Sequence, residues 1–180
     1  LAASLKEKGY SFRMSMIGNG EMEMQLHDMI REKGLEDCVE MLGAMPPEEV
    51  RRHMEKADIY LFTSDFNEGW GAVLNESMNS GCAVVASHAI GSVPFLIKNG
   101  ENGLIYENGN QLDLEKQVLR LLEDGAFRKK IAENAYETMI NLWNAETAAE
   151  RFLTLTEKLL KNENTDSLFL DGPCSKAAIL

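Results

Sequence analysis

Short apolar runs alternate with amphipathic stretches along most of the chain. Phe12, Met14 and Met16 alternate with polar residues and stop at Gly18, a pattern typical of a half-buried strand. Further apolar runs predict strands at 39–42, 58–62, 83–86 and 103–106. Apolar residues at helical spacing predict helices at 1–8, 22–30, from 46 and at 71–80, followed by three more with apolar faces at 114–122, 131–139 and 149–160.

This alternation predicts an α/β fold: a Rossmann-like parallel sheet with helices on both faces. We expect residues 1–160 to form one domain of this kind. Residues 161–180 lose the periodicity and are expected to be a poorly ordered tail or a segment that docks on another domain. A doubly wound sheet normally begins with a strand, whereas this chain begins with a helix and with Leu1. We therefore expect the chain to begin partway through a domain, without that domain's first strand.

The charge balance excludes two classes of partner. The 180 residues carry 18 basic and 29 acidic side chains, a net charge of -11, which argues against nucleic acid and against anionic membrane surfaces. No apolar run approaches the ~20 residues of a membrane span, so direct membrane insertion is not expected. Cys38, Cys82 and Cys174 are too far apart for a zinc or disulfide pattern, which favours reduced thiols in the cytoplasm. The three histidines are scattered, and no metal site is predicted.

Ligands of open parallel sheets bind beyond the carboxyl ends of the strands, and four loops occupy that position here. Three of them are rich in glycine or serine, and their bare N–H groups suit phosphate and sugar oxygens. The four loops are 18–20, 43–45, 63–71 and 87–91. The first resembles a dinucleotide fingerprint but has Glu23 in place of the third glycine, so NAD binding in the Rossmann manner is poorly supported.

The stretch from Ser64 to Glu76 is the richest in candidate chemistry. Glu68 lies in the loop and Glu76 on the second turn of the predicted helix, about 12 Å apart if all eight steps were helical. A carboxylate can accept hydrogen bonds from two neighbouring hydroxyls, so the pair suits an elongated, hydroxyl-rich ligand. The alternative is that Glu68 is a solvated loop charge and Glu76 a partner of the helix dipole.

The sequence from Glu68 to Glu76 resembles the Glu-x7-Glu motif of retaining GT-B glycosyltransferases, the family-4-like "glycosyl transferases group 1". The similarity covers roughly residues 10 to 160, with several motifs in the family's order. The further matching segments are 17–20, 42–43, 57–64, 77–87, 91–94 and 99–104.

The resemblance implies the donor-binding, C-terminal half of a two-domain enzyme. In that family's pattern Glu76 would hold the donor ribose, and Glu68 would contact the donor sugar near its anomeric carbon. The other substrate-binding positions would be backbone N–H groups facing the sugar or diphosphate, loops flanking the diphosphate or base, and one pocket-lining serine. These positions are Trp70, Gly71 and Ala72 with the adjacent Gly69 and Val73; Gly18, Asn19 and Gly20 with Ala44 and Met45; and Ser64.

The implied reaction moves a sugar from a nucleotide-diphosphate donor to a saccharide or lipid-linked acceptor, with retention and with no cofactor or metal required. Cell-surface polysaccharide or glycolipid synthesis would be the setting, in the cytoplasm, with membrane association only through the longer enzyme. The N-terminal acceptor domain would be the partner of this half.

Two departures from the family's pattern qualify this expectation. Phe95 stands where relatives often carry a glutamate, and no segment supplies the usual Arg and Lys to the diphosphate. The family's usual site also lies between this half and the acceptor-binding domain, so we expect the chain alone to be catalytically inert. Two other readings remain open: a non-catalytic sugar-nucleotide-binding or assembly domain, and half of a glucan or sugar-phosphate synthase.

Overall fold

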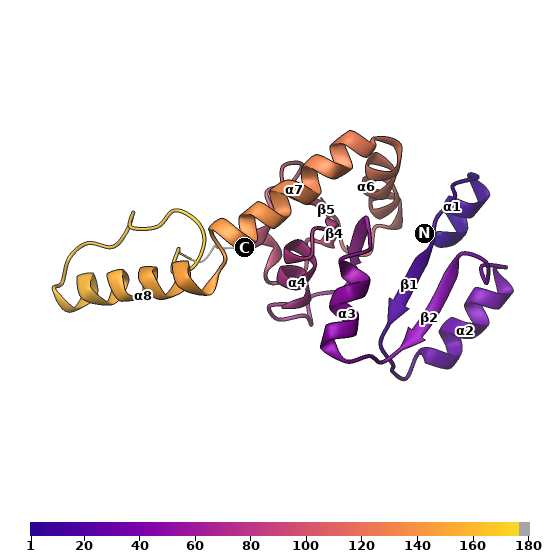
Figure 1. The fold of residues 1–180 in the computed structure, drawn as a ribbon, viewed down its shortest axis with the longest axis horizontal. Coiled ribbons are helices and arrows are strands. Elements are labelled where there is room, and N and C mark those ends of the chain that lie inside the picture. Colours follow the sequence, from indigo (N-terminus) through magenta and orange to yellow (C-terminus); the bar gives the residue numbers. More distant parts are fainter. Residues whose placement is uncertain (177–180) are drawn as a thin grey trace. The chain divides into compact units, whose positions relative to one another are not determined.

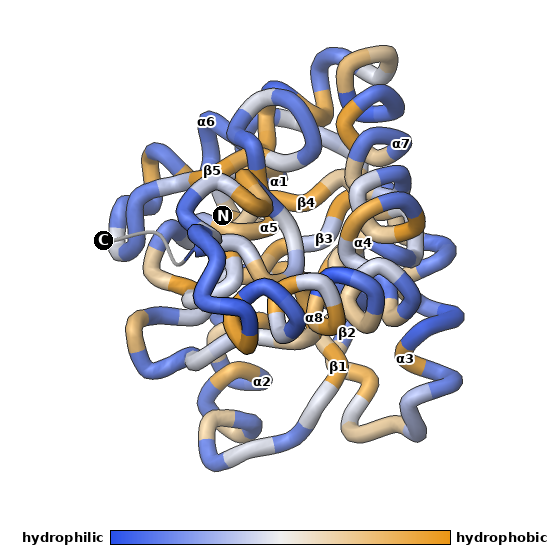
Figure 2. The backbone as a smooth tube through the Cα atoms, turned by 90° about the vertical axis from the view of Figure 1, so that its left-hand side faces the viewer, coloured by the Kyte–Doolittle hydropathy of each residue, from blue (hydrophilic) through white to orange (hydrophobic). Residues whose placement is uncertain are grey.

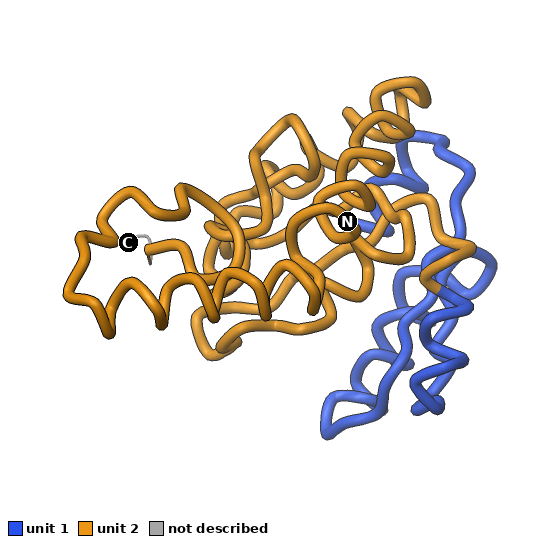
Figure 3. Tube along the Cα trace, turned by 60° about the vertical axis from the view of Figure 1, so that its left-hand side comes forward, with its two compact units in different colours: residues 1–53 blue, residues 54–180 orange. Residues whose placement is uncertain are grey.

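The computed structural model describes residues 1–176, in which helices and strands alternate as far as the fifth strand and helices follow (Figure 1). The chain divides into two compact units, residues 1–53 and residues from 54 onward (Figure 3). Each is described separately below. The expected single domain over residues 1–160 stays a prediction.

Unit 1 contains two parallel strands with helices between and around them. Its elements are α1 (Ala2–Glu7), β1 (Met14–Ile17), α2 (Glu23–Glu32), β2 (Val39–Gly43) and α3 (Pro47–Met54), the last of which ends at the unit boundary. The register runs from Met14 opposite Val39 to Ile17 opposite Gly43, with an irregularity before Ile17. The carboxyl ends of both strands therefore meet at one edge.

Unit 2 is built on a three-stranded parallel sheet of order β3-β4-β5. Its strands are β3 (Ile59–Phe62), β4 (Ala83–Ser87) and β5 (Leu104–Tyr106); its helices are α4 (Val73–Asn79), α5 (Val93–Leu96), α6 (Gln111–Glu123), α7 (Gly125–Asn141) and α8 (Ala145–Leu160). β4 lies in the middle, every one of its residues is buried, and Figure 2 draws it in the orange of hydrophobic residues. Helices α4, α6 and α7 pack on this sheet. The parallel, helix-covered arrangement confirms the predicted fold class.

The described strands form two sheets, whereas the alternating pattern suggested one. In a doubly wound sheet of order 3-2-1-4-5-6, the first strand lies between the second and the fourth. The pairs found here, β2-β1 and β3-β4-β5, follow that order for its second to sixth strands. Within residues 1–176, β1 pairs only with β2, and β3 pairs only with β4.

The last three helices are well capped, but they differ in burial. The side chains of Asn110, Asp124 and Asn144 accept hydrogen bonds from amides in the first turns of α6, α7 and α8. α7 buries Ile131 and Ala135 among other residues, whereas α8 buries none. The apolar face predicted on α8 therefore exists in the sequence but stays uncovered, with Leu160 79% exposed.

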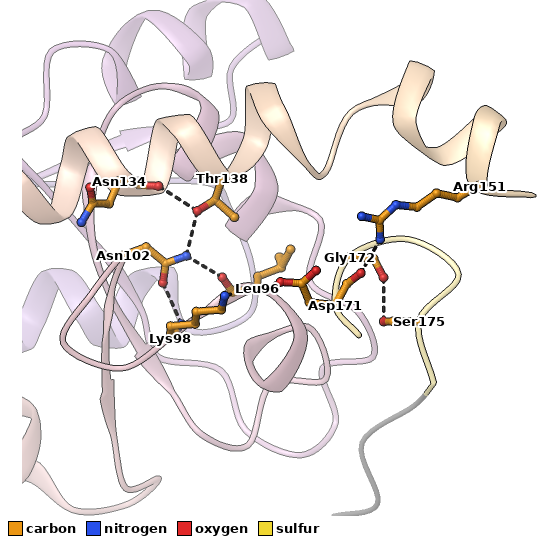
Figure 4. A network of polar contacts seen from close by, with 9 residues as sticks. All are labelled: Leu96, Lys98, Asn102, Asn134, Thr138, Arg151, Asp171, Gly172 and Ser175. Atoms are coloured by element: carbon orange, nitrogen blue, oxygen red, sulfur yellow. Dashed lines mark hydrogen bonds and ion pairs between the residues drawn. The ribbon is translucent and has the colours of Figure 1, made fainter. Parts of the chain in front are cut away.

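Residues 161–176 contain no helix or strand and fold back onto α8. The Arg151 guanidinium lies 4.7 Å from the centre of the Phe169 ring and donates to the carbonyl of Pro173 at 3.4 Å. It also donates to the carbonyl of Asp171 (Figure 4). Lys98 forms an ion pair with Asp171 at 3.4 Å. The predicted tail thus has a defined attachment within unit 2 as far as residue 176, and residues 177–180 lie outside the described part. Among residues 1–176 there is no helix with the length and apolar character of a membrane span.

Candidate functional site

Three loops meet at the carboxyl ends of the unit 2 strands, and Asn108 ties them together. Its side-chain N–H groups donate to the Ser64 carbonyl at 3.2 Å and to the Ser87 hydroxyl at 3.0 Å. Its backbone N–H donates to Nδ1 of His88 at 2.9 Å. These contacts join the residues that follow β3, β4 and β5, so Ser64 is held at the edge where ligands of such sheets bind.

The loop after β3 borders an open, shallow pocket of about 410 Å³ lined by Thr63, Ser64, Asp65, Asn67 and Glu68. Asp65 shapes it, because its carboxylate accepts from the Asn67 backbone N–H at 2.8 Å and its carbonyl accepts from the Glu68 N–H at 3.1 Å. This is a tight turn of the Asx type. Two predicted site residues, Ser64 and Glu68, therefore line one pocket.

Two glycines allow the next part of the loop to lie close to its neighbours. A side chain at Gly91 would place its Cβ 2.0 Å from the carbonyl oxygen of Gly69. Gly71 has φ +74°, and a Cβ there would lie 2.7 Å from the ring of Phe62. The Ser92 N–H also donates to the Trp70 carbonyl at 3.2 Å. The segment from Gly69 to Gly71 is thus held between the end of β3 and the turn before α5.

The Trp70 side chain anchors the same loop to the helices. Its indole N–H donates to Oδ1 of Asn75 at 2.9 Å. Its ring lies 5.6 Å from Phe95 and 5.7 Å from Trp143, both tilted against it. Phe95, the residue where the family often has a glutamate, therefore serves here as an aromatic neighbour of the site loop.

Helix α4 starts later than the sequence suggested. It begins at Val73 with Ala72 as its N-cap, and Glu76 is exposed in its first turn. Gly71 has a positive φ and is therefore part of the loop. Of the remaining predicted residues, Ala72 is exposed and Val73 partly buried.

The pKa of Tyr60 on β3 is affected by the charges of the site. Burial raises the pKa of its hydroxyl to about 12, and the negative charges of Glu76 and Glu68 add to the shift in the pKa. Both carboxylates of the Glu-x7-Glu motif thus act on one point of β3. That the two carboxylates serve a common ligand stays a prediction.

The other predicted residues lie in unit 1, at the carboxyl edge of its own sheet. The Gly18 N–H donates to the Gly43 carbonyl at 2.8 Å, which places the loop of Gly18, Asn19 and Gly20 beside the segment that leads into Ala44 and Met45. Four of these five residues are exposed and Met45 is partly buried. These two loops come together within unit 1, whereas Ser64 and residues 68–76 come together within unit 2.

At the strand-end edge of unit 2, Asn108 was not predicted from the sequence, and His88 was predicted only as part of the candidate loop 87–91. His88 is exposed, its Nδ1 accepts from Asn108, and its ring packs edge-on against Phe66 at 5.5 Å. The available signal was position: Asn108 and His88 each follow a predicted strand by one or two residues. Within residues 1–176, no cluster of three or more His, Cys, Asp or Glu side chains is arranged to hold a metal ion.

The family model described as "Glycosyl transferases group 1" matches residues 1–138. The chain belongs to this family. A curated relative, the amylovoran biosynthesis glycosyltransferase AmsK of Erwinia amylovora, is 32% identical over 160 residues, which are 86% of this chain and 39% of that protein. The chain thus spans well under half the length of this glycosyltransferase.

Two solved structures have the same fold. The C-terminal domain of the group 1 glycosyltransferase LpcC from Francisella tularensis aligns with a TM-score of 0.69 and 27% identity, covering 77% of this chain and 74% of that one. Anabaena HepE, solved in complex with UDP-glucose, aligns with a TM-score of 0.62 and 26% identity over 83% of this chain and 40% of that one. The comparisons confirm the glycosyltransferase family and the likeness to one half of a GT-B structure.

Proposed function

We propose that this chain is the donor-binding half of a retaining glycosyltransferase. The observation that carries the proposal is the loop of residues 68–71, which lines the strand-end pocket with Glu68 and is held by Gly91, Ser92 and Asn75. Such a site can bind a nucleotide sugar through fixed backbone N–H groups and carboxylates, without flexible lysine or arginine side chains. The solved complex of HepE with UDP-glucose supports a nucleotide sugar as the ligand class.

Each residue receives the role that the family resemblance implies. Glu76, exposed at the start of α4, accepts hydrogen bonds from the ribose hydroxyls. Glu68 binds the donor sugar and stabilises positive charge at its anomeric carbon. The backbone N–H groups of residues 69–73 face the sugar and diphosphate, Ser64 lines the pocket, and the loops at 18–20 and 44–45 flank the diphosphate or base.

In the transfer itself, an acceptor hydroxyl oxygen bonds to the anomeric carbon while the bond from that carbon to the phosphate oxygen breaks. The hydroxyl proton passes to the departing phosphate oxygen on the same face, which gives retention. The fixed N–H groups stabilise the charge on the leaving diphosphate without a resident metal. We further propose a saccharide or lipid-linked acceptor, a role in cell-surface polysaccharide or glycolipid synthesis, and a cytoplasmic location, where the three free cysteines stay reduced.

We also propose that turnover requires an acceptor-binding domain of the kind that the longer relatives have room for. This chain should bind donor without transferring sugar. Detectable transfer by these 180 residues to a generic acceptor would contradict that part of the proposal.

Ligand-observed NMR with UDP, GDP, ADP and their glucose conjugates tests the proposal. We expect binding on the order of millimolar, about 4 kcal/mol, with one preferred base and signal transfer to the ribose. Glu76→Ala should abolish that transfer. Glu137→Ala, at an exposed position of α7, is the matched control and should leave it unchanged. Absence of binding to every nucleotide would overturn the donor-binding role.

A further inference from the structure

The Trp70 indole is held by side chains from three places outside its own loop. The hydrogen bond to Asn75 comes from α4, and the two neighbouring rings come from α5 and from the residue before the N-cap of α8. Asn75 is itself fixed, because its side-chain N–H faces the sulfur of Met139 on α7 at 3.8 Å. Trp70 is nevertheless 41% exposed, so packing alone does not hold it.

The backbone of Trp70 is the centre of the proposed sugar-facing loop. It lies between Gly69 and Gly71, and glycines leave a chain free to adopt many conformations. Its carbonyl accepts from Ser92, Gly91 lies against the carbonyl oxygen of Gly69, and the indole adds a restraint through the side chain. A group that orients the indole therefore also orients the N–H groups of the loop.

We propose that Asn75 is a positioning residue for the donor sugar, acting through its hydrogen bond to Trp70. This inference rests on the proposed function. Asn75 is half-buried on α4 and precedes Glu76, but it reaches the loop only by way of the indole. Loss of its oxygen should therefore affect recognition of the sugar and spare recognition of the nucleoside diphosphate, which Glu76 and other loops hold.

The test compares two substitutions of Asn75 with one control. Asn75→Leu removes the acceptor at similar size, and Asn75→Asp retains an acceptor oxygen. Asn79→Leu changes an exposed asparagine of the same helix. The chain has two tryptophans, so making these changes together with Trp143→Phe leaves Trp70 as the sole indole for fluorescence. Amide NMR signals of Gly69 and Gly71, with the affinities for UDP and UDP-glucose, complete the measurements.

We expect Asn75→Leu to shift the Trp70 emission and both glycine signals in the ligand-free chain. It should weaken UDP-glucose binding about three- to tenfold, as for loss of one hydrogen bond, and leave UDP binding unchanged. Asn75→Asp should restore the spectra and the ratio of the two affinities. Asn79→Leu should alter neither.

The possible failures are distinguishable. Equal weakening of UDP and UDP-glucose, or unchanged loop spectra with intact binding, would overturn the role of Asn75 alone. If the unaltered chain bound neither UDP nor UDP-glucose, both the proposed function and the positioning role of Asn75 would be wrong.

Discussion

Gly91 leaves no room for a side chain, since a Cβ there would lie 2.0 Å from the Gly69 carbonyl oxygen. Gly91→Ala must therefore displace the loop of residues 69–71 from its packed position. We expect a loss of about 1–3 kcal/mol in unfolding free energy, and loss of sugar-dependent donor binding. Thermal unfolding and the NMR titration measure the two effects. Gly125→Ala is the control: its Cβ would meet nothing within 4 Å, so stability should hold or rise slightly.

Asn102 is buried and satisfies three hydrogen bonds at once. Its amide N–H groups donate to the Leu96 carbonyl at 2.9 Å and to the Thr138 hydroxyl at 3.0 Å, and its oxygen accepts from the Lys98 N–H at 2.7 Å (Figure 4). It therefore joins the loop after α5 to α7.

Asn102→Leu removes all three hydrogen bonds and leaves the buried Leu96 carbonyl without this donor, which should cost about 2–4 kcal/mol of unfolding free energy. Urea unfolding of the variant measures it. The exposed Asn79→Leu should change stability by no more than about 0.5 kcal/mol. A loss below about 1 kcal/mol at Asn102 would show that water replaces its contacts.

At the scale of elements, Arg151 attaches residues 161–176 to α8 through Phe169 and two backbone carbonyls. Arg151→Lys cannot reproduce a planar guanidinium that stacks and donates in two directions. We expect trypsin to cleave after the exposed Lys161 several-fold faster in this variant. Lys98→Ala, which removes only the exposed ion pair to Asp171, should have a smaller effect. Equal cleavage rates in all three proteins would argue against the attachment.

The elements with strong periodicity were predictable, and the boundaries set by contacts were not. The apolar run of β4 suffices for a buried central strand. The start of α4 depends on Gly71, which has a positive φ and has no room for a Cβ beside the Phe62 ring. The contact with Phe62 cannot be seen in the local sequence. The four-residue helix α5 is too short to produce a periodic pattern. α8 has an apolar face whose exposure the sequence could not reveal.

At the scale of the whole molecule, the sequence predicted which residues lie together after β3 more accurately than it predicted how the strands are arranged. Glu68 and Ser64 line one pocket because both follow β3, as the sequence indicated. The support of Ser64 by Asn108, 44 residues further along the chain, depends on the order of the strands. That order is set by long-range pairing, which periodicity does not encode. The division into two sheets was missed for the same reason.

Alkaline pH should lower the unfolding free energy of unit 2 through the ionisation of Tyr60 and Cys82. Burial raises the pKa of Tyr60 to about 12 and that of Cys82, whose thiol donates to the Met54 carbonyl at 3.1 Å, to about 11. The unfolded chain releases these protons near the model-compound pKa values of 10.0 and 9.0, whereas the fold retains them. Their stabilisation is therefore complete below about pH 9 and is lost as the pH rises to about 12.

Urea unfolding between about pH 8 and pH 12 measures this loss. Tyr60→Phe should flatten the upper part of the decline and Cys82→Ser the lower part, because neither replacement ionises in this range. Tyr136→Phe, at a tyrosine that is 44% exposed on α7, controls for removal of a hydroxyl as such. The charges of Glu68 and Glu76 contribute to the raised pKa of Tyr60, so a donor that binds both carboxylates should change the pKa of Tyr60. A decline of the same steepness in all four proteins would show that other groups govern alkaline unfolding.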